Sequence, residues 1–524
     1  MNNQPHCSCS CCAHSRFRPI PLDITRRDFI VTVSAAAVGG TMLAATPAMA
    51  GASLPTLTRK PPQRLPLKVQ PVLTYSVPKR REAGSWRSWG GIQTDADAKA
   101  EEARITRELA KLKSKADFPV EFLPVALLKD GQSPDALAKG AHDVMLMYAA
   151  GGSHKMLEAL TQPEKWNLMF LRHDPGPVYL WYEIVSPRFL RKMVDDYTQP
   201  GMTVHDVVTD DFAELLWRLR ALHGLKNTLG KKMIAIGGAG GWGVGGKQAP
   251  TISRELWKMD LVDYPYKELS PRIQAARANN DVVKRCQELA ARYLRQSGIT
   301  LHTQRPFIEN AFVLREVFND ILDEAGTDAI TINSCMGTIM PMAQTTACLV
   351  LSLLNDDNYL AFCESDFVVI PSGVLLHYIS GLPVFLNDPT YPHGDIVTLA
   401  HCTAPRKMDG RRGERTKILT HFESDYGAAP KVEMRLGQVC TNLVPDFACK
   451  KWIGFRAKIA ANPFLDICRS QIDVRIEGDS TALMEKMGGF HWMMSYGDYL
   501  KETGYALSKL GIGWLDVSTP KKKA

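Results

Sequence analysis

The feature that most constrains this chain is a regular alternation of strand-like and helix-like segments between about residues 95 and 378. Short apolar runs, such as residues 144–149 and the last four residues of the strand expected at 232–236, are typical of strands buried on both faces. Strands that alternate with helices in this way form parallel sheets covered by helices. The other expected strands are residues 169–171, 178–182, 328–332 and 359–362, and the expected helices are residues 95–116, 211–222, 271–296 and 345–354.

The pattern changes after residue 378. Apolar residues then alternate with polar ones over residues 431–443 and 471–478, which is the period of an antiparallel sheet with one buried face. A final helix is expected over residues 498–510. The sequence therefore predicts an α/β protein with two parallel-sheet α/β domains, residues 51–228 and 229–378, followed by a mainly antiparallel, barrel-like β domain over residues 379–524. A length of 524 residues suits about three domains.

The first fifty residues have the form of an export signal. Arg26 and Arg27 precede an apolar run over residues 29–45, and Ala48-Met49-Ala50 provides a small-x-small cleavage site. This combination is typical of a twin-arginine (Tat) signal. We expect the Tat translocase to be a partner during export, the mature chain to be periplasmic, and no stable membrane anchor to remain after signal cleavage. This route carries folded proteins, which suggests a metal or nucleotide bound before export.

Charge and cysteine content exclude some classes of function. Lys and Arg exceed Asp and Glu by only 63 to 55, and no basic stripe with interleaved aromatic residues occurs, so no nucleic-acid partner is expected. Four of the twelve cysteines lie in the leader. The other eight have no C-x-x-C spacing, which argues against a zinc ribbon or a redox pair and favours buried, unpaired thiols. They are Cys286, Cys335, Cys348, Cys363, Cys402, Cys440, Cys449 and Cys468.

A glycine-rich loop from Gly238 to Gly243 follows the strand expected at residues 232–236. Its spacing, G-x-G-x-x-G, is that of a dinucleotide-binding turn, which would make the chain an exported NAD(P)-dependent oxidoreductase. That turn requires a helix directly after it. Gly245, Gly246 and Pro250 should spoil such a helix in its first turns, so we favour a tight strand-to-loop turn at a domain crevice.

Three other residues suit a divalent metal. Glu364 and Asp388 each end an apolar strand-like run, and His491 lies in a glycine-rich turn. Charges in such places are usually paired or hold a cation. Two carboxylates and an imidazole can bind a divalent ion and leave positions open for a chelating substrate. The alternative is that the acids lie in loops and the histidine is solvated.

These residues resemble the L-fucose/L-arabinose isomerase superfamily, and the bacterial fucose isomerases in particular, over residues 328–515. Glu364-Ser365-Asp366, Asp388-Pro389-Thr390-Tyr391 and Gly488-Gly489-Phe490-His491 match its two strand-end acids and its glycine-rich histidine turn in order. Asn387 stands where the arabinose branch has a carboxylate, which points to the fucose-type ligand set. The resemblance implies two α/β layers, Mn²⁺ or another divalent cation as cofactor, and a homo-oligomer.

The resemblance also implies an activity. It makes Glu364, Asp388 and His491 the metal ligands, and Glu364 and Asp388 the catalytic acid and base of an aldose–ketose isomerase that acts on a sugar through an enediol. The candidates for sugar contacts are His401, which resembles an additional active-site histidine of arabinose isomerases, and His421, Glu423, Trp492 and Tyr496. A non-catalytic carbohydrate-binding relative is a further alternative. We expect the side-chain ligand atoms of the three metal ligands to lie within about 5 Å of a common point.

Overall fold

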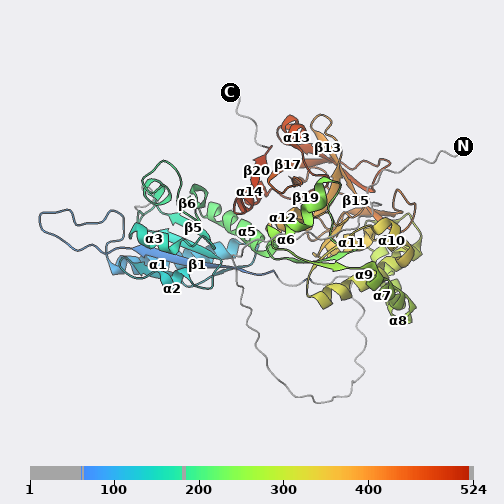
Figure 1. The fold of residues 1–524 in the computed structure, drawn as a ribbon, viewed down its shortest axis with the longest axis horizontal. Coiled ribbons are helices and arrows are strands. Elements are labelled where there is room, and N and C mark those ends of the chain that lie inside the picture. The colour runs from blue at the N-terminus through green and yellow to red at the C-terminus, as the bar shows by residue number, and fades with distance from the viewer. Residues whose placement is uncertain (1–60, 62–63, 180–184, 519–524) are drawn as a thin grey trace, which may run out of the picture.

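The computed structural model describes residues 61, 64–179 and 185–518, and it contains two parallel sheets followed by a closed antiparallel barrel. Figure 1 shows the N-terminal sheet and its helices on one side, and the second sheet and the barrel on the other. The predicted fold class is confirmed. The Tat signal predicted over residues 1–50 lies outside the described residues, as does part of the strand expected at residues 178–182.

The first sheet has the order β2-β1-β4-β5-β6, and β3 also pairs with β1. Every pairing in it is parallel. β4 has the predicted bounds, and all six of its side chains are buried. The strands are β1 (Leu67–Tyr75), β2 (Val120–Phe122), β3 (Ala126–Lys129), β4 (Val144–Ala149), β5 (Trp166–Leu171) and β6 (Val207–Thr209); the helices are α1 (Asp95–Lys115), α2 (Asp135–Ala138), α3 (His154–Leu160) and α5 (Phe212–Thr228).

The second sheet, of order β11-β10-β7-β8, is also parallel. One helix was expected over residues 271–296, and this was wrong. Two helices lie there, because Asn279 caps the second by accepting from the backbone N–H groups of Asp281 and Val282. The strands are β7 (Lys232–Ile236), β8 (Asp260–Tyr264), β10 (Ala329–Ile332) and β11 (Leu360–Cys363); the helices are α6 (Ala249–Glu255), α7 (Tyr266–Ala278), α8 (Asn280–Leu294), α9 (Arg305–Ala325), α10 (Cys335–Ala343), α11 (Cys348–Asp356) and α12 (Ile370–Ser380).

The barrel contains six antiparallel strands in the order β16-β19-β12-β13-β18-β17, and pairing of β16 with β17 closes it. β20 adds to β17 in parallel. The run over residues 431–443 is divided between β15 and β16, and β15 belongs to a separate small sheet with β14 and β9. The strands are β9 (Ile299–Leu301), β12 (Phe385–Pro389), β13 (Ile396–His401), β14 (Arg415–Leu419), β15 (Ala429–Glu433), β16 (Val439–Val444), β17 (Lys451–Ala461), β18 (Ser470–Ile476), β19 (Trp492–Tyr496) and β20 (Gly513–Asp516); the helices are α13 (Ser480–Lys486) and α14 (Leu500–Ser508).

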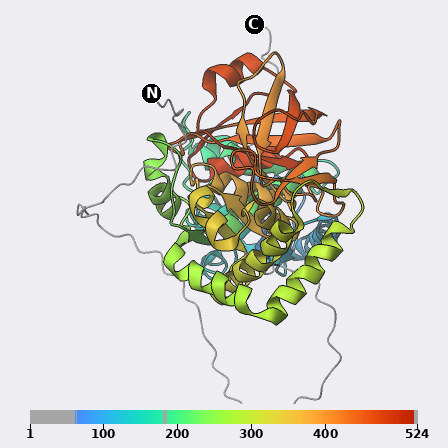
Figure 2. The same ribbon diagram turned by 90° about the vertical axis from the view of Figure 1, so that its right-hand side faces the viewer.

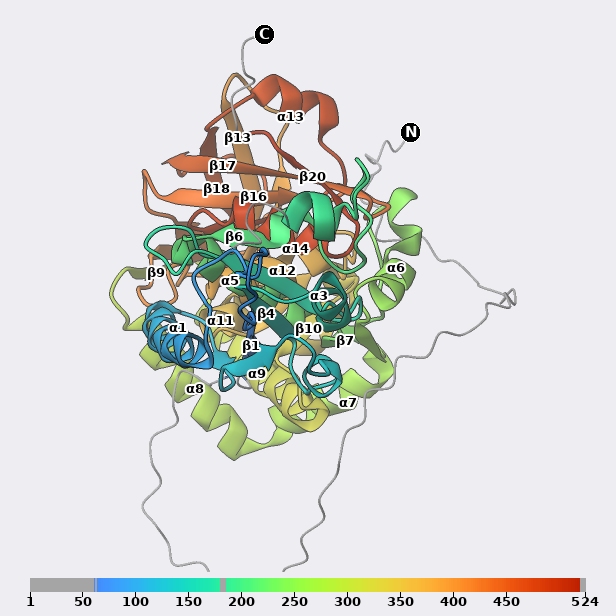
Figure 3. The ribbon, with the colours of Figure 1, turned by 90° about the vertical axis from the view of Figure 1, so that its left-hand side faces the viewer.

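Helix α5 joins the parts of the molecule. It packs against α12 of the second α/β region and α14 of the barrel region. Figure 2 shows the barrel above helices of the second region, and Figure 3 shows α1 and β1 at the near end with the barrel behind and above. In the described part of the chain, no single helix is long and apolar enough to cross a membrane. The pair α10 and α11 meets that test only jointly, and it bends by 89°.

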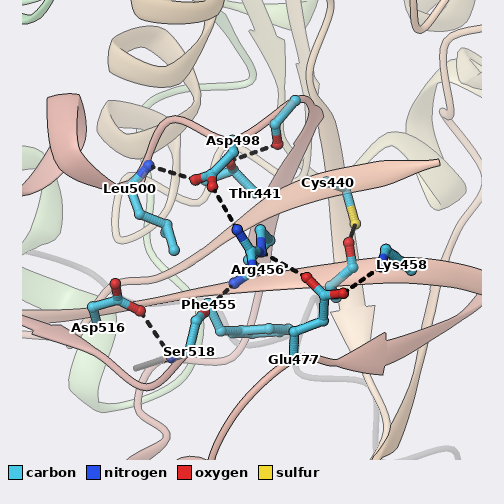
Figure 4. Close-up of polar contacts among 12 residues, drawn as sticks. Cys440, Thr441, Phe455, Arg456, Lys458, Glu477, Asp498, Leu500, Asp516 and Ser518 are labelled. Atoms are coloured by element: carbon cyan, nitrogen blue, oxygen red, sulfur yellow. Dashed lines mark hydrogen bonds and ion pairs between the residues drawn. The ribbon is translucent and has the colours of Figure 1, made fainter. Parts of the chain in front are cut away.

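A cluster of charged side chains crosses one wall of the barrel (Figure 4). Arg456 of β17 donates to Glu477 over 2.6 Å and to Asp498 over 3.1 Å, and Lys458 lies 2.6 Å from Glu477. These side chains join β17 to the segments that follow β18 and β19. They are partly exposed, so each pair contributes at most about 1 kcal/mol, and the apolar interior carries most of the barrel's stability.

Candidate metal centre

The three predicted metal ligands come from three strand ends. Glu364 directly follows β11, Asp388 is in β12, and His491 directly precedes β19. At Glu364 the chain turns sharply, with φ of +64° there and +46° at Ser365. Non-glycine residues rarely adopt this left-handed conformation, and it is concentrated at functional sites. The turn leaves the Glu364 side chain 42% exposed at the end of a buried strand.

The structure brings these three side chains together around one imidazole nitrogen. His491 Nε2 lies 3.2 Å from Glu364 Oε2 and 3.1 Å from Asp388 Oδ1. The imidazole is fully buried, whereas the two carboxylates are 42% and 30% exposed. Of these three side chains, only the two carboxylates therefore have surface in contact with solvent.

The other imidazole nitrogen is held by a residue to which the sequence assigned no role. His491 Nδ1 lies 2.7 Å from Asp366 Oδ2, and both side chains are buried. A histidine that binds a metal through one ring nitrogen usually donates the N–H of the other nitrogen to a carboxylate. This hydrogen bond fixes the orientation of the ring. Asp366 is the third residue of Glu364-Ser365-Asp366, so the motif itself contained the signal for this contact.

The glycine-rich loop after β7 packs against this same segment. Gly240 donates its N–H to the Ser365 carbonyl, and the N–H of Trp242 donates to Asp366 Oδ1 over 3.1 Å. Trp242 also stacks on Phe490, the neighbour of His491, with ring centroids 3.6 Å apart. The loop thus supports both members of the Asp366–His491 pair from one side.

No α-helix begins directly after this loop, as expected, although a short helix that includes Pro250 forms further along. A 3₁₀ turn over Gly245–Gln248 takes up the two glycines, and α6 begins at Ala249. Pro250 lies in the first turn of α6, where a missing N–H costs no helical hydrogen bond. The loop is tightly folded on itself, because a Cβ on Gly241 would lie 2.1 Å from the Gly246 carbonyl oxygen.

Electrostatics at the site favour a positive charge between the carboxylates. Burial raises the pKa of Glu364, but the neighbouring imidazoles of His401 and His491 outweigh burial and hold that pKa well below its usual range. Burial lowers the pKa of His491, yet Asp366 and the two other neighbouring carboxylates raise it well above its ordinary value. The three carboxylates around this imidazole therefore favour a positive charge among them, which either a proton on the ring or a metal ion can provide.

The donor atoms fit a divalent ion. Asp388 Oδ1, His401 Nε2 and His491 Nε2 are all buried and make no hydrogen bond of good geometry, although buried polar atoms are normally satisfied. Ligand atoms of Glu364, His401 and His491 lie within 4.8 Å of one another. The His401 ring is fixed by Thr403 Oγ1, 3.1 Å from Nδ1. His401, expected to contact a sugar, is therefore placed as a possible fourth ligand.

The remaining candidates for sugar contacts are dispersed. Glu423 is exposed on a turn after β14, and His421 is buried beside two cysteines. Trp492 is 1% exposed and packs edge-on against Phe455 in the barrel interior, and Tyr496 is 2% exposed in the same core. Successive side chains along a strand point to opposite faces, so the turn that presents His491 to the metal ligands directs Trp492 into the barrel. The predicted contact between Trp492 and a sugar has no support from this position.

No family model matches the chain, and no curated protein matches it.

Proposed function

We propose that the protein is a metal-dependent aldose–ketose isomerase that acts on a free sugar or sugar derivative. The observation that carries this proposal is the pair of partly exposed carboxylates, Glu364 and Asp388, placed within 3.2 Å of the same buried imidazole nitrogen. The resemblance to fucose isomerases in the order and context of these residues supports it. We propose Mn²⁺ as the ion, because the set of carboxylate oxygens and imidazole nitrogen suits it.

The chain's own residues would share the proton chemistry. Interconverting an aldose and a ketose requires removal of a weakly acidic C–H proton next to a carbonyl and its return to the neighbouring carbon. Glu364 and Asp388 each have two oxygens, so one can hold the ion while the other accepts or returns the proton. A bound divalent cation would supply Lewis-acid stabilisation of the negative charge that develops on the sugar oxygens. Asp366 would keep the His491 ring oriented throughout.

The alternative of a dinucleotide-dependent oxidoreductase has less support. Backbone groups of the loop from Gly238 to Gly243 already bond to residues 365–367. A nucleotide diphosphate would need free N–H groups at the start of a helix, and a 3₁₀ turn stands between this loop and α6. The proposed export through the Tat system agrees with an isomerase that binds its ion before export. In the periplasm, copper and zinc would outcompete manganese because they bind such ligands more tightly.

The test is exchange of the sugar C2 proton with deuterated solvent, followed by NMR across aldoses that include fucose, arabinose and galactose. The Mn²⁺-loaded protein should catalyse exchange, and Glu364→Gln should lower the rate by about 10²- to 10⁴-fold while keeping part of the metal affinity. Glu433→Gln, on the small sheet, is the matched control. Binding of sugar that depends on metal but produces no exchange would identify a non-catalytic relative instead.

A further inference from the structure

A second group of potential ligands lies close to the candidate metal centre. Cys348, Cys402 and His421 are all buried, and their ligand atoms lie within 4.8 Å of one another. Cys348 begins α11, Cys402 follows β13, and His421 follows β14. The three residues are far apart in the sequence, so the search for short cysteine spacings could not find them.

A third thiol adjoins this group. Cys468 packs against the small cluster that Cys348 and Cys402 form with Ala429. Cys468 lies in the segment that leads into β18 and is only partly buried. It therefore supplies both a fourth potential ligand and a side of the cluster that solvent can reach.

Apolar packing does not account for this arrangement. Buried thiols behave as small hydrophobic groups, and Cys286 and Cys440 do so within the two large cores. An imidazole, in contrast, loses hydration on burial and gains nothing from sulfur neighbours unless it binds something with them. The His421 ring is also oriented, because its Nδ1 lies 3.3 Å from Ser424 Oγ. A disulfide between two of the cysteines would use neither the third thiol nor the imidazole.

We propose that Cys348, Cys402 and His421, with Cys468 as the fourth ligand, bind a thiolate-preferring metal ion, Zn²⁺. Three cysteines and one histidine form a closed tetrahedral set of the kind found in structural zinc sites, with metal–ligand distances of about 2.0–2.3 Å. Small side-chain rotations bring donor atoms within 4.8 Å of one another to such distances. The argument for this site does not rest on the proposed isomerase activity.

The two sites share one strand end. His401, the last residue of β13, faces Glu364, and the next residue, Cys402, faces the thiol cluster. The zinc ion would join the segments after β13 and β14 to the start of α11 and to the chain before β18. Its role is therefore structural, and it fixes the strand end that presents His401. The ligand chemistry separates the two ions, since carboxylates select a hard cation and thiolates a soft one.

The experiment is metal binding to the full chain, purified in reductant, freed of metal and titrated with Co²⁺ as a spectroscopic substitute for Zn²⁺. One equivalent should produce a sulfur-to-cobalt charge-transfer band, and Zn²⁺ should abolish the band by displacement. Cys348→Ala and Cys402→Ala should each weaken binding by more than about 100-fold, since loss of a ligand should exceed the effect of losing an outer partner. Cys286→Ala and Cys440→Ala, which remove buried thiols elsewhere, are the matched controls.

Two further variants guard against simple misfolding. His421→Gln should lose the band, whereas His421→Cys should restore it, because a fourth thiolate also completes a zinc site. Glu364→Gln should keep the band, which separates this site from the proposed catalytic centre. A chain that shows no charge-transfer band, that binds only Cu⁺, or that contains a disulfide among these cysteines instead of metal would overturn the proposal.

Discussion

The carboxylate of Asp366 lies 2.7 Å from Nδ1 of His491, and neither side chain is accessible to solvent. This contact joins the segment after β11 in the second parallel sheet to the entry of β19 in the barrel. The candidate metal centre is consequently built across two parts of the fold, and its geometry depends on how firmly they are held together.

Asp366→Asn should weaken Mn²⁺ binding by about 10- to 100-fold, the usual effect of losing an outer carboxylate partner of a metal-binding histidine. The amide keeps the size of the side chain but no longer fixes the ring with a charge. Titration calorimetry of the metal-free protein measures the effect. Asp395→Asn, which removes an exposed carboxylate paired with Arg475, is the control and should leave the affinity unchanged. Equal affinities for wild type and Asp366→Asn would show that Asp366 does not orient the histidine.

Gly241→Ala should disturb the same contact from the opposite side. The new methyl group would meet the Gly246 carbonyl at 2.1 Å, so the loop must shift and carry the Trp242 N–H away from Asp366. We expect a loss of about 1–3 kcal/mol in the free energy of unfolding, together with weaker metal binding. Gly337→Ala in α10, where a Cβ meets nothing within 4 Å, should instead be neutral or stabilising. Chemical denaturation compares the two variants.

Ser365→Gly should stabilise the protein by about 1 kcal/mol, because a left-handed backbone costs non-glycine residues about 1–2 kcal/mol. The serine hydroxyl is also buried without a hydrogen-bond partner, so its removal leaves nothing unsatisfied. Ser372→Gly in the first turn of α12 should be destabilising, since it loses a hydrogen bond to the Val369 carbonyl and adds a flexible residue to a helix. If Ser365→Gly were destabilising as well, the prediction would be wrong: the contacts of the serine side chain would stabilise the turn by more than its left-handed backbone destabilises it.

His223 should make the fold sensitive to acid. Burial and nearby Arg64 lower the pKa of this histidine to about 4, whereas in the unfolded chain it is about 6.5. The unfolded chain therefore takes up the proton first as the pH falls. The contribution of neutral His223 to the free energy of unfolding is fully present above about pH 6.5. It falls by up to about 3 kcal/mol as the pH drops towards 4.

His223→Leu should therefore reduce the difference in unfolding free energy between pH 7 and pH 5. His142, whose pKa burial and Lys165 lower to about 4, should maintain part of that difference. The exposed His302 gives the control variant, His302→Leu, which should show the wild-type difference. Urea denaturation at the two pH values is the measurement, and an unchanged difference in His223→Leu would contradict the assignment.

The sequence predicted the fold better than it predicted the surroundings of the site. Apolar runs located β4 and β7, because strands buried on both faces have no polar residue within their buried part; in β7 only the first residue, Lys232, is polar and exposed. The break at Asn279 was missed, since helical periodicity continues across it and only the capping side chain ends one helix and starts the next. The period-two run over residues 431–443 contains parts of two strands, β15 in the small sheet and β16 in the barrel, and the alternation of apolar residues does not show which sheet a strand joins.

At the site, the sequence named Glu364, Asp388 and His491, which the structure brings together, because each lies in a motif of its own. Contacts between motifs could not be found in this way. The Asp366–His491 pair spans 125 residues, and the cluster of Cys348, Cys402 and His421 has no repeated spacing. Trp492 was assigned to a sugar because it follows His491, but the alternation of side chains at a strand turns neighbours to opposite sides.

The position of His491 in the chain has a consequence for biosynthesis. Glu364 and Asp388 leave the ribosome well before it, and the barrel cannot close until β19, which His491 introduces, pairs with β12 and β16. A nascent or truncated chain that stops short of this strand presents two acids without their imidazole. If the proposed ion binds here, all three ligands can hold it only after β19 has been made and has paired, so occupancy of the centre would report that this part of the barrel has folded.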